Sequence, residues 1–217
     1  MDCGALLFDL DGTLVDSSTV LERTWSAWAL MHGFNPRLVV GLAHGRRPID
    51  TVRDFLPNSN LYSEVTRLEA IELSELDQVV ALPGAQDALR MVLDNQWAVV
   101  TSGSRKLALG RIEASGLPRP KILITGDDVG RGKPDPECYM AAAIRLGRNP
   151  ADCIAFEDAP SGLAAARAAG CTVVALTTTH SPNRLKEAKA DGIVPNLAWV
   201  RFGRKDGRVQ ITLRHST

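Results

Sequence analysis

The sequence lacks a net charge, because 25 Lys and Arg residues balance 25 Asp and Glu residues over 217 positions. Proteins that bind nucleic acid or an anionic membrane through surface charge are usually strongly basic. We therefore expect neither partner. The locally basic stretch 201–214 is better explained as a solvated hairpin, because an Asp-Gly turn signal at 206–207 separates two strand-like segments.

Closely spaced cysteines and long apolar runs are also lacking. The four cysteines, Cys3, Cys138, Cys153 and Cys171, include no Cys-x-x-Cys pair, which argues against a metal or redox motif of that type. Cys3 and Cys153 adjoin apolar segments, where free cysteine is often a small buried hydrophobe. No apolar run is long enough to cross a membrane. Because a signal peptide would remove carboxylates that follow closely after Met1, we predict a cytoplasmic protein.

Two carboxylates follow the first apolar segment of the chain. Residues 5–8 predict a buried strand, and Asp9 and Asp11 come directly after it, with Gly12 and Thr13 next. Residues i and i+2 point the same way off an extended chain, so both carboxylates aim at the crevice where open α/β sheets bind ligands. Two acids this close repel each other unless a cation lies between them or one holds a proton. A plain Asp-Gly turn is the simpler alternative.

The apolar pattern changes twice along the chain. Between 17 and 82 it is helical, and it predicts a first helix that ends near Gly33, with Trp25 and Trp28 as core residues, and further helices over 49–55 and 61–80. After 84, strands alternate with helices. The predicted strands are 97–100, 122–124, 153–156, 172–176 and 193–194, the helices are 85–95, 105–115, 136–147 and 160–169, and a hairpin covers 200–213.

Alternating strands and helices predict an α/β fold with a parallel sheet and helices on both faces. Residues 1–15 and 84–217 would form this core, and residues 16–83 would form an inserted helical domain. The two crossing points, at 14–16 and 82–84, are the natural hinges between them. The sequence shows no internal repeat and no low-complexity segment.

Hydroxyl side chains and a lysine follow later strands. Thr101 and Ser102 end the strand 97–100, and hydroxyls with free backbone N–H groups at a strand-to-helix turn suit a phosphate. Simple helix capping by Ser102 or Ser104 is the alternative. Lys133 precedes two prolines that stiffen the chain, so its ammonium is placed to contact phosphate oxygens or carboxylates. An ordinary surface lysine is the alternative there.

A second acidic pair, Glu157 and Asp158, directly follows the predicted strand 153–156. Adjacent acids at the end of a buried strand are costly without a cation. A set of ligands made only of oxygen atoms favours a hard ion, and Mg²⁺ is the one that also bridges to phosphate. A solvated turn is the alternative.

Together and in this order, the four motifs resemble those of the haloacid dehalogenase-like hydrolase superfamily, in the subfamily with a helical cap inserted after the first motif. The resemblance covers essentially the full length and implies a Rossmann-like core. In detail the chain looks like bacterial sugar and sugar-alcohol (hexitol) phosphatases, and the yeast glycerol phosphate and deoxyglucose phosphate phosphatases have a similar pattern. The segments that carry the resemblance are 8–17, 44–45, 101–104, 132–134 and 157–160.

The resemblance implies a Mg²⁺-dependent phosphoric monoester hydrolase. Asp9 would attack phosphorus and form an aspartyl-phosphate, and Asp11 would protonate the leaving alcohol and then take a proton from the attacking water. Mg²⁺ would be held by Asp9, the backbone carbonyl of Asp11 and Asp158, with Glu157 as a further or water-mediated ligand. The residues implied to bind substrate are Gly12, Thr13, Thr101, Ser102 and Lys133.

Four alternatives can be weighed on residues of the chain. A dehalogenase uses the nucleophile without a second Asp two residues on, whereas Asp11 is present. Phosphonoacetaldehyde hydrolase needs a cap lysine, and no lysine precedes Lys106. β-Phosphoglucomutase-like phosphomutases carry a cap histidine where Leu21 stands, and commonly Val or Ile where Thr13 stands. A non-catalytic phospho-ligand-binding module would be signalled by loss of Asp9 or Asp11.

The resemblance places substrate choice in the cap. The segment 44–47 lies between cap helices, so Arg46 or Arg47 is expected to meet substrate hydroxyls, with solvent-exposed arginines as the alternative. We hypothesise a small phosphorylated polyol or hexose as the substrate, such as a hexitol phosphate, a hexose 6-phosphate or glycerol 3-phosphate. A monomer is expected, because the cap sequence shows no evident apolar patch for self-association.

Overall fold

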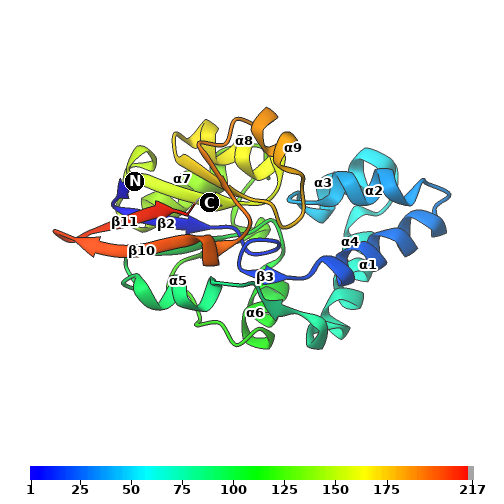
Figure 1. Ribbon diagram of the computed structural model, residues 1–217. Coiled ribbons are helices and arrows are strands. Elements are labelled where there is room, and N and C mark those ends of the chain that lie inside the picture. Colours follow the sequence, from blue (N-terminus) through cyan, green and yellow to red (C-terminus); the bar gives the residue numbers. More distant parts are fainter. Residues whose placement is uncertain (215–217) are drawn as a thin grey trace.

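A six-stranded parallel sheet forms the centre of the computed structural model, which describes residues 1–214 (Figure 1). The strand order is β6-β5-β2-β7-β8-β9, and each neighbouring pair is parallel. The strands are β2 (Ala5–Phe8), β5 (Trp97–Val100), β6 (Leu123–Ile124), β7 (Cys153–Glu157), β8 (Thr172–Leu176) and β9 (Gly192–Val194). The predicted α/β class with a Rossmann-like sheet is confirmed. Residues 215–217 of the predicted core lie outside the described part.

Helices cover both faces of this sheet, as the alternation of segments predicted. Successive strand residues point to opposite faces: Leu6 and Phe8 pack with α5 and α6, whereas Ala5 and Leu7 pack with α7, α8 and α9. Both sets of side chains are buried, which explains why these strands are uniformly apolar. The helices are α5 (Ala85–Met91), α6 (Arg105–Ala114), α7 (Glu137–Arg145), α8 (Pro160–Ala169) and α9 (Pro182–Glu187).

Four helices between β3 (Val15–Asp16) and β4 (Val80–Ala81) form a separate group, which we call the helical insertion and which lies at the right of Figure 1. They are α1 (Ser18–Met31), α2 (Pro36–Ala43), α3 (Pro48–Phe55) and α4 (Leu61–Ser74). Trp25 and Trp28 are buried in an apolar cluster of their own there, as expected. The two connections to the sheet pair with each other as the antiparallel strands β3 and β4. The division into two domains with hinges at these connections stays a prediction.

The prediction for the helical insertion lacked one helix and misplaced the end of another. α2 was not predicted, although Asn35 caps it by accepting from the Arg37 N–H (3.0 Å) and Pro36 is its first residue, both common helix-start signals. The helix predicted over 61–80 ends at Ser74, because the following residues form a short 3₁₀ turn and then β4, which pairs with β3. Outside the insertion, the helix predicted over 85–95 ends at Met91.

The predicted C-terminal hairpin is present, and it belongs to a second sheet. β10 (Val200–Lys205) and β11 (Arg208–Leu213) are joined at 206–207, where both residues have positive φ, and β11 also pairs with β1 (Asp2–Cys3). The short 3₁₀ helices are Leu76–Gln78, Gly126–Asp128, Pro150–Asp152 and Leu197–Trp199. None of the helices within residues 1–214 combines the length and the apolar character needed to span a membrane.

Candidate active site

A cavity of about 60 Å³ lies where the carboxyl ends of β2, β5 and β7 face the helical insertion; we call it the central cavity. The residues of the sheet side that line it include Asp9, Asp11, Gly12, Thr101, Ser102 and Asp158. The insertion contributes Leu21, Trp25, His44, Arg46 and Glu72 among others. Most of the predicted site residues therefore border one space, although they are far apart in sequence. Thr13, Lys133 and Glu157 do not line it.

Asp9 is fixed by the sheet that it follows. Its backbone N–H donates to the carbonyl of Phe156 on β7 (3.0 Å), which extends the strand pairing by one residue. The chain then turns at Gly12, whose φ of +79° lies in the left-handed region that favours glycine. A Cβ at position 12 would lie 2.3 Å from Oδ2 of Asp158. The glycine therefore allows the first acidic motif to approach the second.

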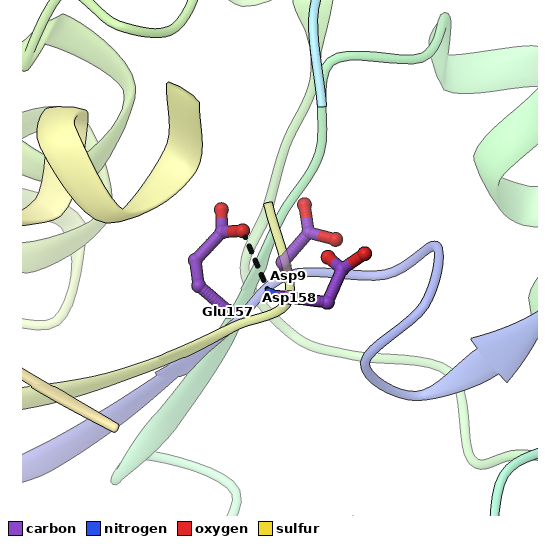
Figure 2. A group of neighbouring side chains, drawn as sticks. All are labelled: Asp9, Glu157 and Asp158. Atoms are coloured by element: carbon purple, nitrogen blue, oxygen red, sulfur yellow. Dashed lines mark hydrogen bonds between the residues drawn. The ribbon is translucent and has the colours of Figure 1, made fainter. Parts of the chain in front are cut away.

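Asp9, Glu157 and Asp158 form a buried carboxylate group at the ends of β2 and β7, with one oxygen of each within 4.8 Å of the others. Figure 2 shows the carboxylates of Asp9 and Asp158 next to each other, with Glu157 on the other side of the chain. Burial raises the pKa of Asp9 well above its usual range although Lys133 opposes this, and burial followed by the charge of Glu157 raises the pKa of Asp158 to about 8. A cation between these oxygens would relieve the repulsion, so the donor set fits Mg²⁺.

Lys133 supplies a positive charge next to the nucleophile that the motifs predict. Its Nζ donates to Oδ1 of Asp9 (2.5 Å), to Oε1 of Glu157 (2.6 Å) and to the carbonyl of Val100 (3.2 Å). Burial lowers the pKa of Lys133, but the two carboxylates outweigh burial and raise it above its usual value. The ammonium is therefore charged and held in place, as the two prolines that follow Lys133 suggested.

Both carboxylate oxygens of Glu157 already accept hydrogen bonds from other groups of the protein. Its Oε1 accepts from Lys133 and from the hydroxyl of Tyr139 (2.6 Å), and its Oε2 accepts from the backbone N–H groups of Asp158 (3.2 Å) and Ala159 (3.4 Å). These contacts fix the ammonium of Lys133 beside Asp9. The expectation that Glu157 is a further or water-mediated metal ligand stays a prediction.

Thr101 and Ser102 reach the cavity from the end of β5. The hydroxyl of Thr101 accepts from the Gly103 N–H (3.1 Å), and the hydroxyl of Ser102 donates to the carbonyl of Gly45 in the insertion (2.9 Å). Ser104, not Ser102, caps α6 by accepting from the Leu107 N–H (3.1 Å). The capping alternative therefore does not account for Ser102, whose hydroxyl lies at the junction of sheet and insertion.

Asp11 is held by an ion pair that the sequence did not suggest. Its Oδ2 lies 2.8 Å from Nη1 of Arg111 on α6, and its Oδ1 accepts from the hydroxyl of Ser17 (2.6 Å). The same guanidinium reaches the insertion, because its Nη2 donates to Oε2 of Glu72 on α4 (2.9 Å). One arginine thus joins the predicted acid–base residue to the helices above it.

The other predicted substrate contacts differ in their surroundings. Arg46 lines the central cavity and pairs with Asp54 (2.7 Å). Arg47 instead binds Asp50 (2.7 Å) and the carbonyl of Val129 (2.9 Å), which ties the insertion to the loop before Lys133. The hydroxyl of Thr13 is buried and has no hydrogen-bond partner among the described residues. Substrate contacts of Arg46 and Thr13 stay predictions.

Five residues at the site were not predicted from the sequence. They are Glu72, Arg111, Tyr139, Thr178 and Thr179. The hydroxyl of Thr179 donates to the carboxylate of Asp158, and that of Thr178 donates to the carbonyl of Gly12. Both threonines follow β8 as the four motifs follow their strands, so a search for polar residues at strand ends could have found them. The other three lie within helices, where no local signal marks them.

The site combines an Asp-x-Asp motif, a fixed lysine and a second acidic pair at one edge of a parallel sheet, next to a helical insertion. This combination indicates one class of hydrolases. Residues 3–170 match the haloacid dehalogenase-like hydrolase family, and the chain belongs to this family. The predicted resemblance is thereby confirmed.

The relatives that match the chain are aligned over most of their own length. The chain is 44% identical to hexitol phosphatase A of Escherichia coli K12 over 193 residues, which cover 86% of this chain and 89% of that one. It is 36% identical to glycerol-1-phosphate phosphohydrolase 2 of Saccharomyces cerevisiae over 92% of this chain and 84% of that one. Among solved structures, a hydrolase from Pseudomonas syringae superposes with a TM-score of 0.81 at 26% identity, covering 90% of this chain and 94% of that chain.

Proposed function

We propose that the protein is a Mg²⁺-dependent phosphatase that hydrolyses small sugar or sugar-alcohol phosphates through an aspartyl-phosphate intermediate. The observation that carries this proposal is the setting of Asp9, which lines the central cavity against Lys133 and Asp158, with Asp11 two residues further on. The relatives named for hexitol phosphate and glycerol-1-phosphate support the class of substrate.

The reaction divides into two displacements at phosphorus. In the first, an Asp9 oxygen bonds to phosphorus while the bond to the alcohol oxygen breaks, and protonated Asp11 gives its proton to that oxygen. In the second, Asp11 takes a proton from water, the water oxygen bonds to phosphorus, and Asp9 is released. Lys133, Thr101 and Ser102 stabilise the negative phosphoryl oxygens by charge and hydrogen bonds.

The metal would be held by oxygen atoms that surround Asp9. Carboxylate oxygens of Asp9 and Asp158 and the backbone carbonyl of Asp11 are the ligands we propose. When bound, Mg²⁺ neutralises charge on the phosphoryl group. The buried carboxylates fit this role, since without a cation they repel each other.

Substrate entry requires the helical insertion to move. The central cavity holds about 60 Å³, whereas pockets for small ligands usually have several hundred. The chain enters and leaves the insertion through β3 and β4 only, so a change at these two strands would open the cavity. Closure then excludes water other than the reacting molecule.

Hydrolysis is favoured over phosphoryl transfer between sugar hydroxyls by one residue of the cavity wall. The mutases that the chain resembles carry a histidine early in the first helix of the insertion, where it helps to activate the sugar hydroxyl. Leu21 of α1 lines the central cavity where the resemblance would place that histidine. An apolar side chain cannot take a proton, so water is the acceptor we propose.

The test is phosphate release with Mg²⁺ from a panel of sugar, polyol and nucleotide phosphates. We expect release from sugar or polyol phosphates, loss of release with EDTA, and a decrease of at least 10³-fold in Asp9→Asn, which keeps the shape but not the nucleophile. Asp16→Asn is the matched control, because this exposed acid of the same segment does not line the cavity. Interconversion of hexose phosphates without release would assign a mutase, and inactivity in both assays would assign a binding module.

A further inference from the structure

A buried ion pair borders the central cavity. Glu72 on α4 and Arg111 on α6 are joined at 2.9 Å, and their side chains are only 7% and 4% exposed. Both line the same cavity as Asp9 and Asp11. Neither residue forms a bond to phosphorus or transfers a proton in the two displacements, and holding Asp11 requires Arg111 but not Glu72, so the pair calls for another explanation.

Stability does not supply that explanation. Buried ion pairs cost desolvation, and apolar residues of similar volume often replace them without loss. The hydrogen-bonding capacity of this pair is also not used up: Oε1 of Glu72 accepts no hydrogen bond from the described residues, and Nη1 and Nη2 of Arg111, which carry two N–H groups each, contact one carboxyl group each. Unsatisfied groups beside a cavity are suited to bind a ligand that enters it.

The charges beside the cavity indicate what kind of ligand fits. The guanidinium of Arg111 contacts two carboxyl groups, Asp11 (2.8 Å) and Glu72 (2.9 Å), so its charge is balanced by Glu72 even when Asp11 holds a proton. A second anionic group on the substrate would therefore find no unpaired positive charge there. A neutral group that both donates and accepts hydrogen bonds, namely an alcohol hydroxyl, matches a carboxylate beside a guanidinium.

The remaining wall accepts the carbon atoms of the same molecule. Leu21, Trp25 and Leu107 line the cavity together with the ion pair. Apolar side chains next to a few polar groups are the usual composition of a small-molecule site, and they suit the C–H groups of a polyol chain or a sugar ring.

We propose that Glu72 and Arg111 are the specificity-determining pair, which binds hydroxyl groups of the alcohol portion and so selects neutral polyhydroxylated phosphate esters over esters that carry a second acid or no hydroxyl. This inference rests on the proposed phosphatase function. It assigns Glu72 as the hydroxyl acceptor and Arg111 as the donor, with Arg111 also positioning Asp11.

Glu72→Gln tests the pair, because it keeps the shape and removes the charge. We expect KM for a hexitol phosphate to rise about tenfold or more, as for loss of a charged hydrogen bond, and the ratio of kcat/KM for the hexitol phosphate to kcat/KM for p-nitrophenyl phosphate, which has no hydroxyl, to fall by a similar factor. A free hexitol should inhibit p-nitrophenyl phosphate hydrolysis competitively in the wild type and weakly in the variant. Wild-type kcat/KM should be low for phosphoglycolate, and its ratio to that of the hexitol phosphate should rise in Glu72→Gln.

Glu69→Gln is the matched control, because Glu69 lies on the same helix but does not line the central cavity. Its carboxylate accepts from the hydroxyl of Ser104, which follows β5 of the sheet (2.6 Å). If Glu72 only clamps the insertion to the sheet, both variants will change all substrates alike, which overturns the specificity role. If Glu72→Gln does not fold, Glu72→Asp replaces it, because this variant retains the charge. Competitive inhibition of the wild type by the free hexitol then supports hydroxyl binding at this site, and its absence overturns the proposal. A wild type that releases phosphate from no ester refutes the phosphatase function itself.

Discussion

At position 162 the site has room for a glycine but not for a larger side chain. Gly162 lies in the first turn of α8, and a Cβ there would lie 1.8 Å from Oε1 and 2.0 Å from Cδ of Glu157. Glu157 is fully buried and cannot move without releasing Lys133 and Tyr139. The glycine is therefore needed for the lysine to stay beside Asp9.

We expect Gly162→Ala to lower the free energy of unfolding by about 1–3 kcal/mol, the usual range for overpacking, and to reduce phosphate release because Lys133 shifts. Gly41→Ala is the matched control: this glycine also lies in a helix, α2, and a Cβ there meets nothing within 4 Å. It should raise the free energy of unfolding by about 0.5–1 kcal/mol. Urea unfolding of both variants measures the difference, and equal effects would contradict the role of Gly162.

How far single residues could be predicted depends on how local their signal is. Asp9, Thr101 and Asp158 follow apolar strands directly, so the sequence shows that they lie at the same edge of a sheet, and the structure brings them to one cavity. Arg111 and Tyr139 act through partners at least 18 residues away in sequence. No spacing rule connects such pairs, and only the packed helices reveal them.

A half-buried polar contact joins two helices of the helical insertion. Nε1 of Trp28 on α1 donates to Oε2 of Glu64 on α4 (2.8 Å), and Nε2 of His32 lies 3.2 Å from the same oxygen. The hydrogen bond from Trp28, helped by His32 and Arg67, lowers the pKa of Glu64 below its usual 4.5. The ionised carboxylate therefore stabilises the pairing of α1 with α4.

Glu64→Gln should reduce the free energy of unfolding at pH 7 by about 1 kcal/mol, since a charged acceptor is replaced by a neutral one. Because the folded-state pKa is lower than the unfolded value, the contribution of Glu64 is present above about pH 4.5 and is lost as the pH falls through the folded pKa. The wild type and the variant should therefore converge in acid. Denaturant unfolding from pH 7 to pH 3 measures this, with Glu113→Gln on an exposed site as control. A constant difference across this range would exclude the ionised contact.

Whole elements could be predicted where burial on two faces makes a strand uniformly apolar. The central strands β2, β5, β7 and β8 were found within one residue for this reason. The short strands β1, β3 and β4 were not, because each has only two residues and exists through pairing with a distant segment. Two residues are too few to show the alternation of apolar and polar side chains by which a strand is recognised in a sequence.

At the scale of the whole molecule, three polar contacts join sheet and insertion beside the central cavity. Ser102 binds the carbonyl of Gly45, Ser104 binds Glu69, and Arg111 binds Glu72. Each apolar cluster lies instead within the sheet layers or within the insertion. Polar junctions can exchange partners with water and substrate at low cost, which suits the opening that the small cavity requires.

The buried carboxylates at this junction also predict how the stability of the whole molecule responds to metal. Asp9 and Asp158 are buried side by side, and their repulsion opposes folding until a cation lies between them. A ligand that binds only the folded state at 100 times its Kd adds about 2.7 kcal/mol. We therefore expect Mg²⁺ to raise the thermal midpoint relative to EDTA, whereas Na⁺ at equal ionic strength does not.

Asp158→Asn separates metal binding from general effects of salt on this stability. The amide keeps the side-chain volume and can still accept from Thr179, but it removes one of the two adjacent charges. The metal-free variant should therefore be at least as stable as the metal-free wild type, and its midpoint should no longer respond to Mg²⁺. Asp94→Asn, at an exposed acid paired only with Lys121 among the described residues, should keep the full response. Differential scanning calorimetry measures all three proteins, and a Mg²⁺ shift that survives in Asp158→Asn would place the ion elsewhere.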